Sequence, residues 1–238
     1  MALAGVDSRR KCEAFVLRGD VMINGVVVRN LAQQVDPAAD EILYKGRQLL
    51  VNKRVYYLLH KPKGVTCTAS DPHAKRNLFD VLPPGLVPVD DRSASMRCRV
   101  FPVGRLDRET TGLLLVTNDG ALAQRLLHPR YGLERVYHVT LSRAVDRRDL
   151  DKLTKGIRLS DGMARAKSAK QISPRQVQIV LCEGKKREVR RMFMKLGYPV
   201  SQLARIAFGP LTLGDLACGR GRYLRPGEIK ALQAAAKI

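Results

Sequence analysis

The sequence predicts an α+β protein in which a small helix-and-hairpin unit precedes a larger domain built on a largely antiparallel, mixed β-sheet. After Lys53, apolar segments typical of strands outnumber helical ones. Helical spacing of apolar residues is found there at 121–128 and 188–196. The first 50 residues instead combine one short helix with two strands joined by a tight turn. Strands and helices that are mixed in this way favour an α+β architecture.

The composition indicates a globular protein with a polyanionic partner. The 238 residues are 45% hydrophobic and 27% charged, which excludes a disordered or fibrous chain. Charged residues interrupt every apolar run before it reaches the ~18 residues that a membrane helix needs. The net charge is +21, with 7 basic and 6 acidic residues up to Leu50 and 36 and 16 after it. Nucleic acid is therefore the leading partner class, although ribosomal and membrane-surface proteins share such a surplus.

The cysteine and histidine residues predict neither disulfides nor a metal site. The five cysteines are odd in number and widely spaced, with no C-x-x-C pair, which favours reduced thiols in a reducing compartment. The four histidines show no metal-ligand spacing, so we expect no zinc site. The amino terminus has too short an apolar stretch for a secretion signal, and we expect a cytoplasmic protein, or one of an organelle stroma or matrix if the source is eukaryotic.

The first unit combines a basic helix with a hairpin. Ser8 is a good helix N-cap, and apolar positions 12, 15 and 16 follow at helical spacing. Gly19 is expected to end this helix. The Asn24-Gly25 pair suits a tight turn between two strands because both residues tolerate positive φ angles, and residues 41–44 predict a further strand. The alternative interpretation is a small packing module without a ligand.

The larger part presents one carboxylate in a loop that precedes an apolar strand. Residues 54–59 and 113–117 have the pattern of strands, and Lys61-Pro62-Lys63-Gly64 predicts a turn. Asp107 lies just ahead of the second strand, among arginines. An opposite charge within ~4–6 Å would keep this aspartate ionised and suited to act as a nucleophile. The alternative is a salt bridge in a surface turn.

Tyr137 is the candidate aromatic residue of the site. Residues 134–141 alternate as a strand, which places Tyr137 on one face with Arg135 and Val139. A ring in that position is suited to stack on a base. The alternative is a core tyrosine whose hydroxyl is hydrogen-bonded.

A basic turn leads from a strand at 177–181 into the helix at 188–196. Its apolar residues fall at positions 189, 192, 193 and 196, which is the spacing of a buried helical stripe. Arg190 borders this stripe, whereas Arg187, Arg191 and Lys195 are expected to point toward water, where they would meet phosphates. A half-buried arginine needs a carboxylate partner, and we expect Arg190 to pair with Asp107.

Several motifs together resemble a known family. The segments SRRKCEAFVLRGDVMINGVVV and VDPAADEI resemble the S4-like RNA-binding domain over about residues 2–51, with only the end of that domain's first helix present at residues 2–6. GRLDRETTGLLL, ERVYHV, EGKKREVRRMF, LARIAFGPLTL and GRYLRP resemble the pseudouridine synthases of ribosomal RNA that carry such a domain. VGRLD followed by LLLVTNDG is similar to the branch that acts on the large subunit, while the stretch 86–99 is longer than is usual there.

The resemblance implies a reaction and a set of roles. The enzyme would break the glycosidic bond of a flipped-out uridine, turn the uracil over and reattach it through C5, without a metal or another cofactor. Asp107 would be the essential residue, as nucleophile or as base at the ribose. Tyr137 would stack on the uracil and assist proton removal, and Arg190 would orient Asp107. Arg105 would contact a phosphate or fill the vacated space, and Val189 would form an apolar wall.

The resemblance also implies a division into an S4-like domain at 1–51 and a catalytic domain at 52–238. The expected partner is ribosomal RNA, as a structured stem-loop or a pre-ribosomal particle, bound by a monomer that does not associate with membranes. The residues expected to contact this RNA are Ser8, Arg9, Arg10, Lys11, Arg18, Lys61, Lys63, Lys185, Lys186, Arg187 and Arg191.

Two other functions remain open at this point. One is a non-catalytic RNA-binding factor of ribosome assembly on the same fold, although such a protein has no physical need for Asp107 and Tyr137. The other is an RNA hydrolase that uses Asp107 with a metal, although the further carboxylates that two-metal chemistry requires are missing nearby.

Overall fold

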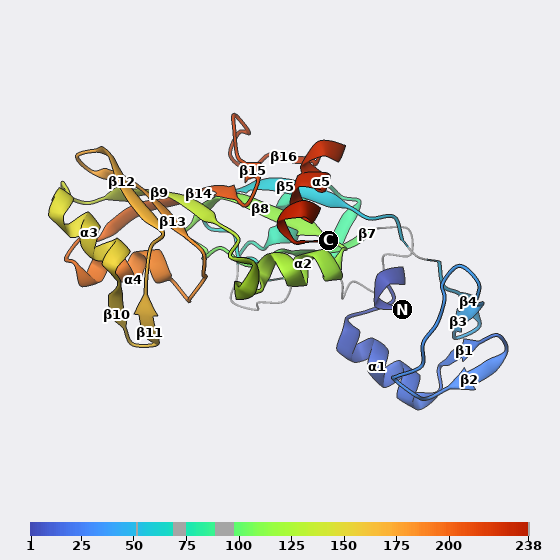
Figure 1. Ribbon diagram of the computed structural model, residues 1–238. Coiled ribbons are helices and arrows are strands. Elements are labelled where there is room, and N and C mark those ends of the chain that lie inside the picture. Colours follow the sequence, from blue (N-terminus) through green and yellow to red (C-terminus); the bar gives the residue numbers. More distant parts are fainter. Residues whose placement is uncertain (51, 69–74, 89–97, 238) are drawn as a thin grey trace.

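The computed structural model describes residues 1–50, 52–68, 75–88 and 98–237, which form two separate main sheets (Figure 1). A four-stranded sheet belongs to the N-terminal unit, and a ten-stranded sheet to the larger part. The sequence also predicts a loop at 69–72 and a longer polar excursion at 90–99, and all of the first and most of the second lie outside the described residues. No helix in the described ranges is long and apolar enough to cross a membrane.

The N-terminal unit has the expected helix and hairpin. After a short turn of 3-10 helix, η1 (Ala2–Ala4), helix α1 (Arg9–Arg18) begins after Ser8 and ends at Gly19, which adopts the left-handed conformation. Strands β1 (Val21–Ile23) and β2 (Val26–Val28) are joined by Asn24 and Gly25, both with positive φ. Strands β3 (Ile42–Tyr44) and β4 (Arg47–Gln48) complete the sheet in the order β2-β1-β3-β4. A hydrogen bond from Arg99 to the carbonyl of Val6 connects this unit to the larger part.

The large sheet is mixed and mostly antiparallel, as predicted. Its main path runs β12-β13-β9-β14-β8-β5-β16, with β6, β7 and β15 attached. The pairs β14–β8 and β6–β7 are parallel, whereas the other pairs described in this sheet are antiparallel. The strands are β5 (Tyr56–Lys61), β6 (Leu86–Pro88), β7 (Cys98–Pro102), β8 (Thr111–Thr117), β9 (Arg135–Leu141), β12 (Ser168–Ser173), β13 (Gln176–Leu181), β14 (Val200–Phe208), β15 (Leu211–Thr212) and β16 (Gly221–Tyr223).

Four helices accompany the described part of this sheet, and the sequence predicted two of them. Helices α2 (Gly120–Leu127) and α4 (Glu188–Lys195) match the expected segments. Helices α3 (Arg147–Lys155) and α5 (Pro226–Ala235) were missed, although Asp146 caps the first and Pro226 opens the second. Smaller elements are the 3-10 turns η2 (Leu78–Val81) and η3 (Pro129–Tyr131) and the hairpin of β10 (Ile157–Leu159) and β11 (Gly162–Ala164).

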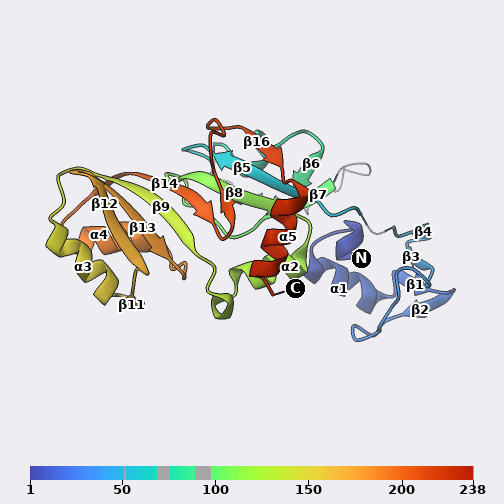
Figure 2. The same cartoon turned by 45° about the horizontal axis from the view of Figure 1, so that its top comes forward.

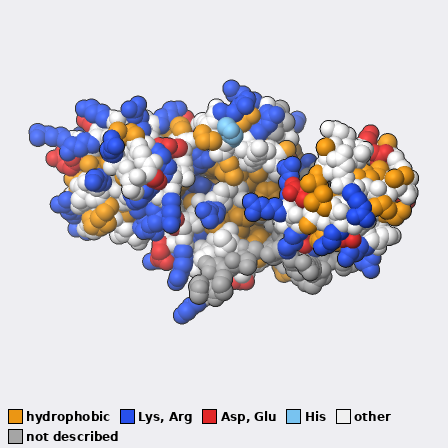
Figure 3. All heavy atoms as spheres, turned by 90° about the horizontal axis from the view of Figure 1, so that it is seen from below, with side chains coloured by type: hydrophobic (Ala, Val, Ile, Leu, Met, Phe, Trp, Pro, Cys, Tyr) orange, Lys and Arg blue, Asp and Glu red, His pale blue; other side chains and the backbone are white. Residues whose placement is uncertain are grey.

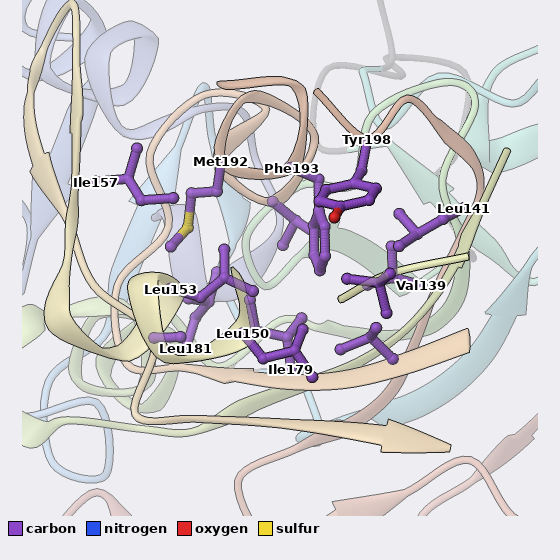
Figure 4. Close-up of a cluster of buried hydrophobic side chains, with 14 of the residues drawn as sticks. Val139, Leu141, Leu150, Leu153, Ile157, Ile179, Leu181, Met192, Phe193 and Tyr198 are labelled. Atoms are coloured by element: carbon purple, nitrogen blue, oxygen red, sulfur yellow. The ribbon is translucent and has the colours of Figure 1, made fainter. Parts of the chain in front are cut away.

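Three apolar clusters hold the larger part together. One lies between β9, β13 and helices α3 and α4, and contains the fully buried Met192 and Phe193 of the predicted stripe (Figure 4). The other two lie on opposite faces of β5 and β8: Leu113 and Leu115 face α2 and α5, whereas Leu114 and Val116 face the opposite side. Figure 2 shows the two halves of the sheet side by side, with the N-terminal unit beyond the β5–β8 half.

The parallel pairing of β14 with β8 joins the two halves and depends on Gly112. This residue pairs with Arg205 and has a φ of 109°. A Cβ atom at this position would lie 2.2 Å from the carbonyl oxygen of Arg205, so a residue other than glycine would force the strands apart. The close approach fixes the backbone of Arg205 beside the loop that carries Asp107.

Candidate active site

A cavity of about 740 Å³ opens where the two halves of the large sheet meet. Its wall combines the loop around Asp107, the strand residue Tyr137 and the segment from Glu183 to Val189. Other residues of the cavity wall are Cys67, Thr68, Arg105, Leu106, Thr110, Arg135, Leu181, Leu203 and Arg205. Residues of four sequence motifs, GRLDRETTGLLL, ERVYHV, EGKKREVRRMF and LARIAFGPLTL, therefore line a single cavity, although the chain separates them by up to about a hundred residues.

The Asp107 loop is held from beneath by a buried lysine. The ammonium of Lys61 donates hydrogen bonds to the carbonyls of Pro62 at 2.9 Å, Arg108 at 3.4 Å and Thr110 at 2.9 Å. The Lys61 side chain is fully buried, and burial lowers its pKa. The prediction that Lys61 contacts RNA is thus wrong, because three backbone acceptors inside the protein already occupy its donors.

Cys67 fixes the other side of the same loop. Its Sγ atom donates to the Leu106 carbonyl at 3.3 Å and accepts from the Leu106 amide at 3.4 Å. The amide of Thr110 donates to the Asp107 carbonyl at 3.0 Å, which closes a tight turn around the aspartate. The backbone of Asp107 is therefore positioned by buried neighbours, and its side chain keeps 32% of its surface exposed.

The guanidinium within ion-pair distance of Asp107 is that of Arg187, not the predicted Arg190. Arg187 Nη1 lies 3.9 Å from Asp107 Oδ2. Arg190 instead donates to the carbonyls of Val200 at 3.1 Å and Glu109 at 3.2 Å. Burial lowers the pKa of Arg190, and the charge of Arg187 lowers it further. Arg187 takes the place expected for Arg190 beside Asp107, because it precedes α4 in a left-handed conformation, with a φ of 51°, and its side chain reaches the cavity.

Tyr137 and Val189 lie in the cavity wall as expected. Tyr137 is half-buried on β9 and packs against two of the apolar clusters. Its neighbours along the predicted face, Arg135 and Val139, are both buried. Val189 is 4% exposed at the start of α4 and adds an apolar surface to the cavity. Arg105 is exposed and belongs to the lining.

The other predicted RNA-contacting residues fall into two sets. Lys185, Lys186 and Arg187 line the cavity. Arg191 does not, since its guanidinium is held by both carboxylate oxygens of Asp161 at 2.8 and 2.9 Å. Arg191 therefore already has a carboxylate partner in the structure, and its contact with phosphate stays a prediction. Lys63 is 69% exposed and lies 3.3 Å from Glu109.

The predicted basic residues of the N-terminal unit lie on α1 and are not among the residues that line the cavity. Arg9, Lys11 and Arg18 are within 3.6 Å, 3.2 Å and 3.0 Å of Glu13, Asp7 and Asp20, respectively. Arg10 is exposed, and Ser8 occupies the N-cap position of the helix. Figure 3 shows that Lys and Arg side chains far outnumber Asp and Glu on one face of the molecule.

Two acidic residues of the cavity were not predicted. Glu188 is 3% exposed, and its Oε2 atom accepts a hydrogen bond from the Lys185 amide at 3.0 Å. Burial and the neighbouring Glu183 raise the pKa of Glu188 to about 7. Burial opposes ionisation of Glu183 as well, but hydrogen bonds from Lys185 and Glu188 lower its pKa. Glu188 is therefore the more readily protonated of these two neighbouring carboxyl groups near neutral pH.

Arg135 and Arg205 are further buried residues of the cavity that sequence reasoning did not assign. They are 8% and 2% exposed. Each lies on the face of its strand that also carries a buried apolar residue, Val139 for Arg135 and Leu203 for Arg205, a signal that could have marked it as functional. As for metals, no group of three or more His, Cys, Asp or Glu residues suited to an ion was found within the described ranges.

Comparisons with known proteins point to one family. The family model for RNA pseudouridylate synthase matches residues 55–195. An RNA pseudouridine synthase of Aquifex aeolicus is 38% identical, with 96% of this chain and 90% of that protein covered. Ribosomal large subunit pseudouridine synthase B of Bacillus subtilis is 37% identical, with 99% and 94% covered. A crystal structure of a pseudouridylate synthase superposes with a TM-score of 0.66 at 27% identity, over 94% of both chains. The chain belongs to the RNA pseudouridylate synthase family.

Proposed function

We propose that the protein converts a uridine of large-subunit ribosomal RNA into pseudouridine, with Asp107 as the reacting carboxylate. The observation that carries this proposal is the convergence of Asp107, Tyr137 and Arg187 on one cavity. The large-subunit substrate is supported by the name of the Bacillus subtilis relative, whose alignment covers nearly the whole of both chains.

The chemistry suits the groups that line the cavity. The N1–C1′ bond of uridine breaks, the uracil turns over and a C5–C1′ bond forms, while C5 loses a proton and N1 gains one. Nothing is oxidised or reduced in this isomerisation. A carboxylate that acts at the ribose, as nucleophile or as base, must be ionised. Arg187 Nη1 lies 3.9 Å from Asp107 Oδ2, which places a cation beside this carboxylate.

The uridine must leave its helix or loop to reach Asp107. Extrusion costs a few kcal/mol, which stacking on an aromatic ring offsets by ~1–3 kcal/mol per base. Tyr137 is the residue proposed to stack on the uracil, with Val189 as the apolar wall beside it. Arg105, at the exposed margin of the cavity, would contact the flanking phosphate, and Arg190 would hold the loop through the Glu109 carbonyl.

The N-terminal unit, up to the boundary proposed at residue 51, would bind structured RNA as an S4-like domain. Its exposed Arg10, together with Arg9, Lys11 and Arg18 of the same helix, supplies the positive charge for phosphate contacts. Residues 52–238 would carry the catalytic cavity. Cations on both parts of the protein would bind one RNA across its structured and single-stranded regions.

The experiment that tests this function is a map of pseudouridines in large-subunit ribosomal RNA. Cells that lack the gene should lose pseudouridine at one position or a small set of neighbouring positions. The wild-type gene should restore it, whereas a gene that encodes Asp107→Ala should not. Identical maps with and without the gene would contradict the proposal.

A further inference from the structure

The cavity holds a buried guanidinium whose donors are not all used. Arg205 is 2% exposed, and its Nε atom donates to the Leu113 carbonyl at 2.9 Å. Its Nη2 atom is buried and has no hydrogen-bond partner among the described residues. Buried donors are usually paired, so an unpaired one calls for a physical explanation. Arg135, the other buried arginine of the cavity, differs in that its Nη1 atom donates to three backbone carbonyls.

Unpaired buried polar atoms are concentrated at this cavity. Six buried side-chain nitrogen or oxygen atoms lack a partner within the described part of the chain, and four of them belong to cavity residues. These four residues are Thr68, Thr110, Glu188 and Arg205. Such a concentration is expected where a polar ligand completes the hydrogen bonding.

Arg205 lies next to the ring that is proposed to stack on the base. It pairs with Tyr137 across the antiparallel strands β14 and β9, so the two side chains project from the same face of the sheet. The Arg205 guanidinium also lies over the ring of the fully buried Phe208, 5.0 Å from its centroid. The close approach of Gly112 to its backbone restricts Arg205 further. The guanidinium is therefore preorganised in the cavity wall beside Tyr137.

We propose that Arg205 donates a hydrogen bond to a carbonyl oxygen of the flipped uracil, an inference that rests on the function proposed above. A base is favoured over a phosphate because Arg205 is buried near Leu203 and Val189, which are apolar. The exposed cation Arg105 lies at the margin, where the charged backbone of the RNA would stay in contact with water. A buried guanidinium is thus matched to a neutral acceptor oxygen deep in the cavity.

The symmetry of uracil makes this contact useful throughout the reaction. A half-turn about the axis through N3 and C6 exchanges N1 with C5, and it exchanges O2 with O4. A donor that faces one carbonyl oxygen of uridine therefore faces the other carbonyl oxygen after the base has turned. Arg205 would hold the base in the same place before cleavage and before reattachment.

The same contact would discriminate against cytosine. Cytosine has an amino group in place of O4, so one of its two orientations would bring N–H donors against the guanidinium. Two donors that face each other in a buried site leave both unpaired, which is costly. Arg205 would thus contribute to specificity for uracil as well as to its position.

The test compares Arg205→Met and Arg205→Lys with Arg175→Gln, a change at an exposed arginine outside the cavity. Release of tritium from C5 of uridine is measured under single-turnover conditions in transcripts of large-subunit ribosomal RNA. We expect Arg205→Met to react about 10- to 100-fold more slowly, as is typical for loss of a hydrogen bond from a charged group. Its affinity for RNA should stay within about twofold of wild type, because exposed cations supply most of that affinity. Arg205→Lys should fall between Arg205→Met and wild type, and Arg175→Gln should react like wild type.

A second measurement depends on a direct contact between Arg205 and the base. A purely structural defect in the variant would not change its result. Transcripts that contain 2-thiouridine or 4-thiouridine replace one acceptor oxygen with sulfur, which is a weaker acceptor. At least one of them should slow the wild-type enzyme several-fold more than it slows Arg205→Met. Equal slowing of both enzymes, or an Arg205→Met rate within threefold of wild type, would overturn the proposal. A wild-type protein that releases no tritium from these transcripts would contradict the proposed function instead.

Discussion

Arg187 Nη1 lies 3.9 Å from Asp107 Oδ2, whereas the guanidinium of Arg190 binds two backbone carbonyls. The two arginines belong to one basic segment and are separated by three positions in the sequence. Arg187 is thereby suited to interact with the charge of Asp107. Arg190 is suited to stabilise the loop that carries Asp107. The distinction leads to different expectations for their variants.

Arg187→Gln should reduce turnover more than stability. The substitution removes the cation that we expect to hold the Asp107 carboxylate in position. A misplaced reacting group loses about 10²-fold in rate, so we expect kcat to fall about 10- to 100-fold. The side chain of Arg187 is 48% exposed, and the melting temperature should change little. Tritium release and thermal unfolding check the two expectations. A normal kcat in Arg187→Gln would contradict the role of this cation.

Arg190→Gln is the matched variant and should behave in the opposite way. It leaves the carbonyls of Glu109 and Val200 without their charged donor, so the free energy of unfolding should fall by about 2 kcal/mol. The activity that remains should follow the folded fraction of the protein. An unchanged unfolding curve for Arg190→Gln would show that these hydrogen bonds do not stabilise the loop.

Lys61→Met should destabilise the protein and disturb the Asp107 loop. The variant retains much of the apolar stem but leaves three carbonyls without a donor, at an expected cost of about 3 kcal/mol. Denaturant unfolding measures this loss. Lys63→Met provides the control, since Lys63 is exposed and only two residues away. Equal stabilities of the two variants would be inconsistent with Lys61 as the anchor of the loop.

Glu188 should make stability depend on pH. Its folded-state pKa of about 7 lies above the ordinary value of 4.5, so the folded protein binds more protons than the unfolded chain between these limits. The free energy of unfolding should therefore decrease as pH rises from about 4.5 to about 7. Glu188→Gln should flatten this slope, because glutamine can donate to Glu183 at every pH. Chemical unfolding at a series of pH values measures both slopes, and equal slopes would contradict the raised pKa of Glu188.

The opposite pH dependence is expected from Glu228. Both its carboxylate oxygens accept from Arg222 at 2.7 Å, and this hydrogen bonding lowers its pKa to about 2. Its contribution to stability is present above its ordinary pKa of 4.5 and is lost as pH falls toward about 2. The contributions of the two carboxyl groups to stability can thus be measured separately, because Glu228 titrates at a lower pH than Glu188.

RNA affinity should fall steeply with salt. Because the protein has a net charge of +21, its cations are expected to displace counterions from the RNA on binding. The logarithm of the binding constant should decline linearly with the logarithm of the salt concentration, at about −0.7 per phosphate contacted on single strands. Lys186→Gln should reduce this slope by about the same amount. An affinity that is insensitive to salt would indicate that phosphate contacts do not drive binding.

Local patterns were sufficient to predict much of the fold. The apolar stripe of α4 and the Asn24-Gly25 turn both depend on neighbours in the sequence, and both are present. Helix α3 was missed because most of its residues are charged or polar and it buries only Leu150 and Leu153. Strand β14 was noted as part of a family motif, but its pairing with both β8 and β9 is a tertiary property.

The site was predicted in its main residues but not in their pairing. Asp107, Tyr137 and Val189 line a common cavity, since motif and resemblance identify residue types, while their roles in the reaction stay predictions. The pairing of Asp107 with Arg187 in place of Arg190 depends on the left-handed backbone at Arg187, which the spacing of residues does not reveal. The burial of Lys61 likewise depends on carbonyls that are contributed by a loop about 50 residues later in the chain. These features arise from folding of the whole domain.

The most direct test of the account is the rate at which Asp107→Asn releases tritium from C5-labelled uridine in large-subunit ribosomal RNA. The variant removes the reacting carboxylate without adding bulk. We expect no detectable release, with RNA affinity within a few-fold of wild type and an unchanged melting temperature. Turnover by Asp107→Asn at a rate close to wild type would contradict the central claim that this carboxylate carries out the isomerisation.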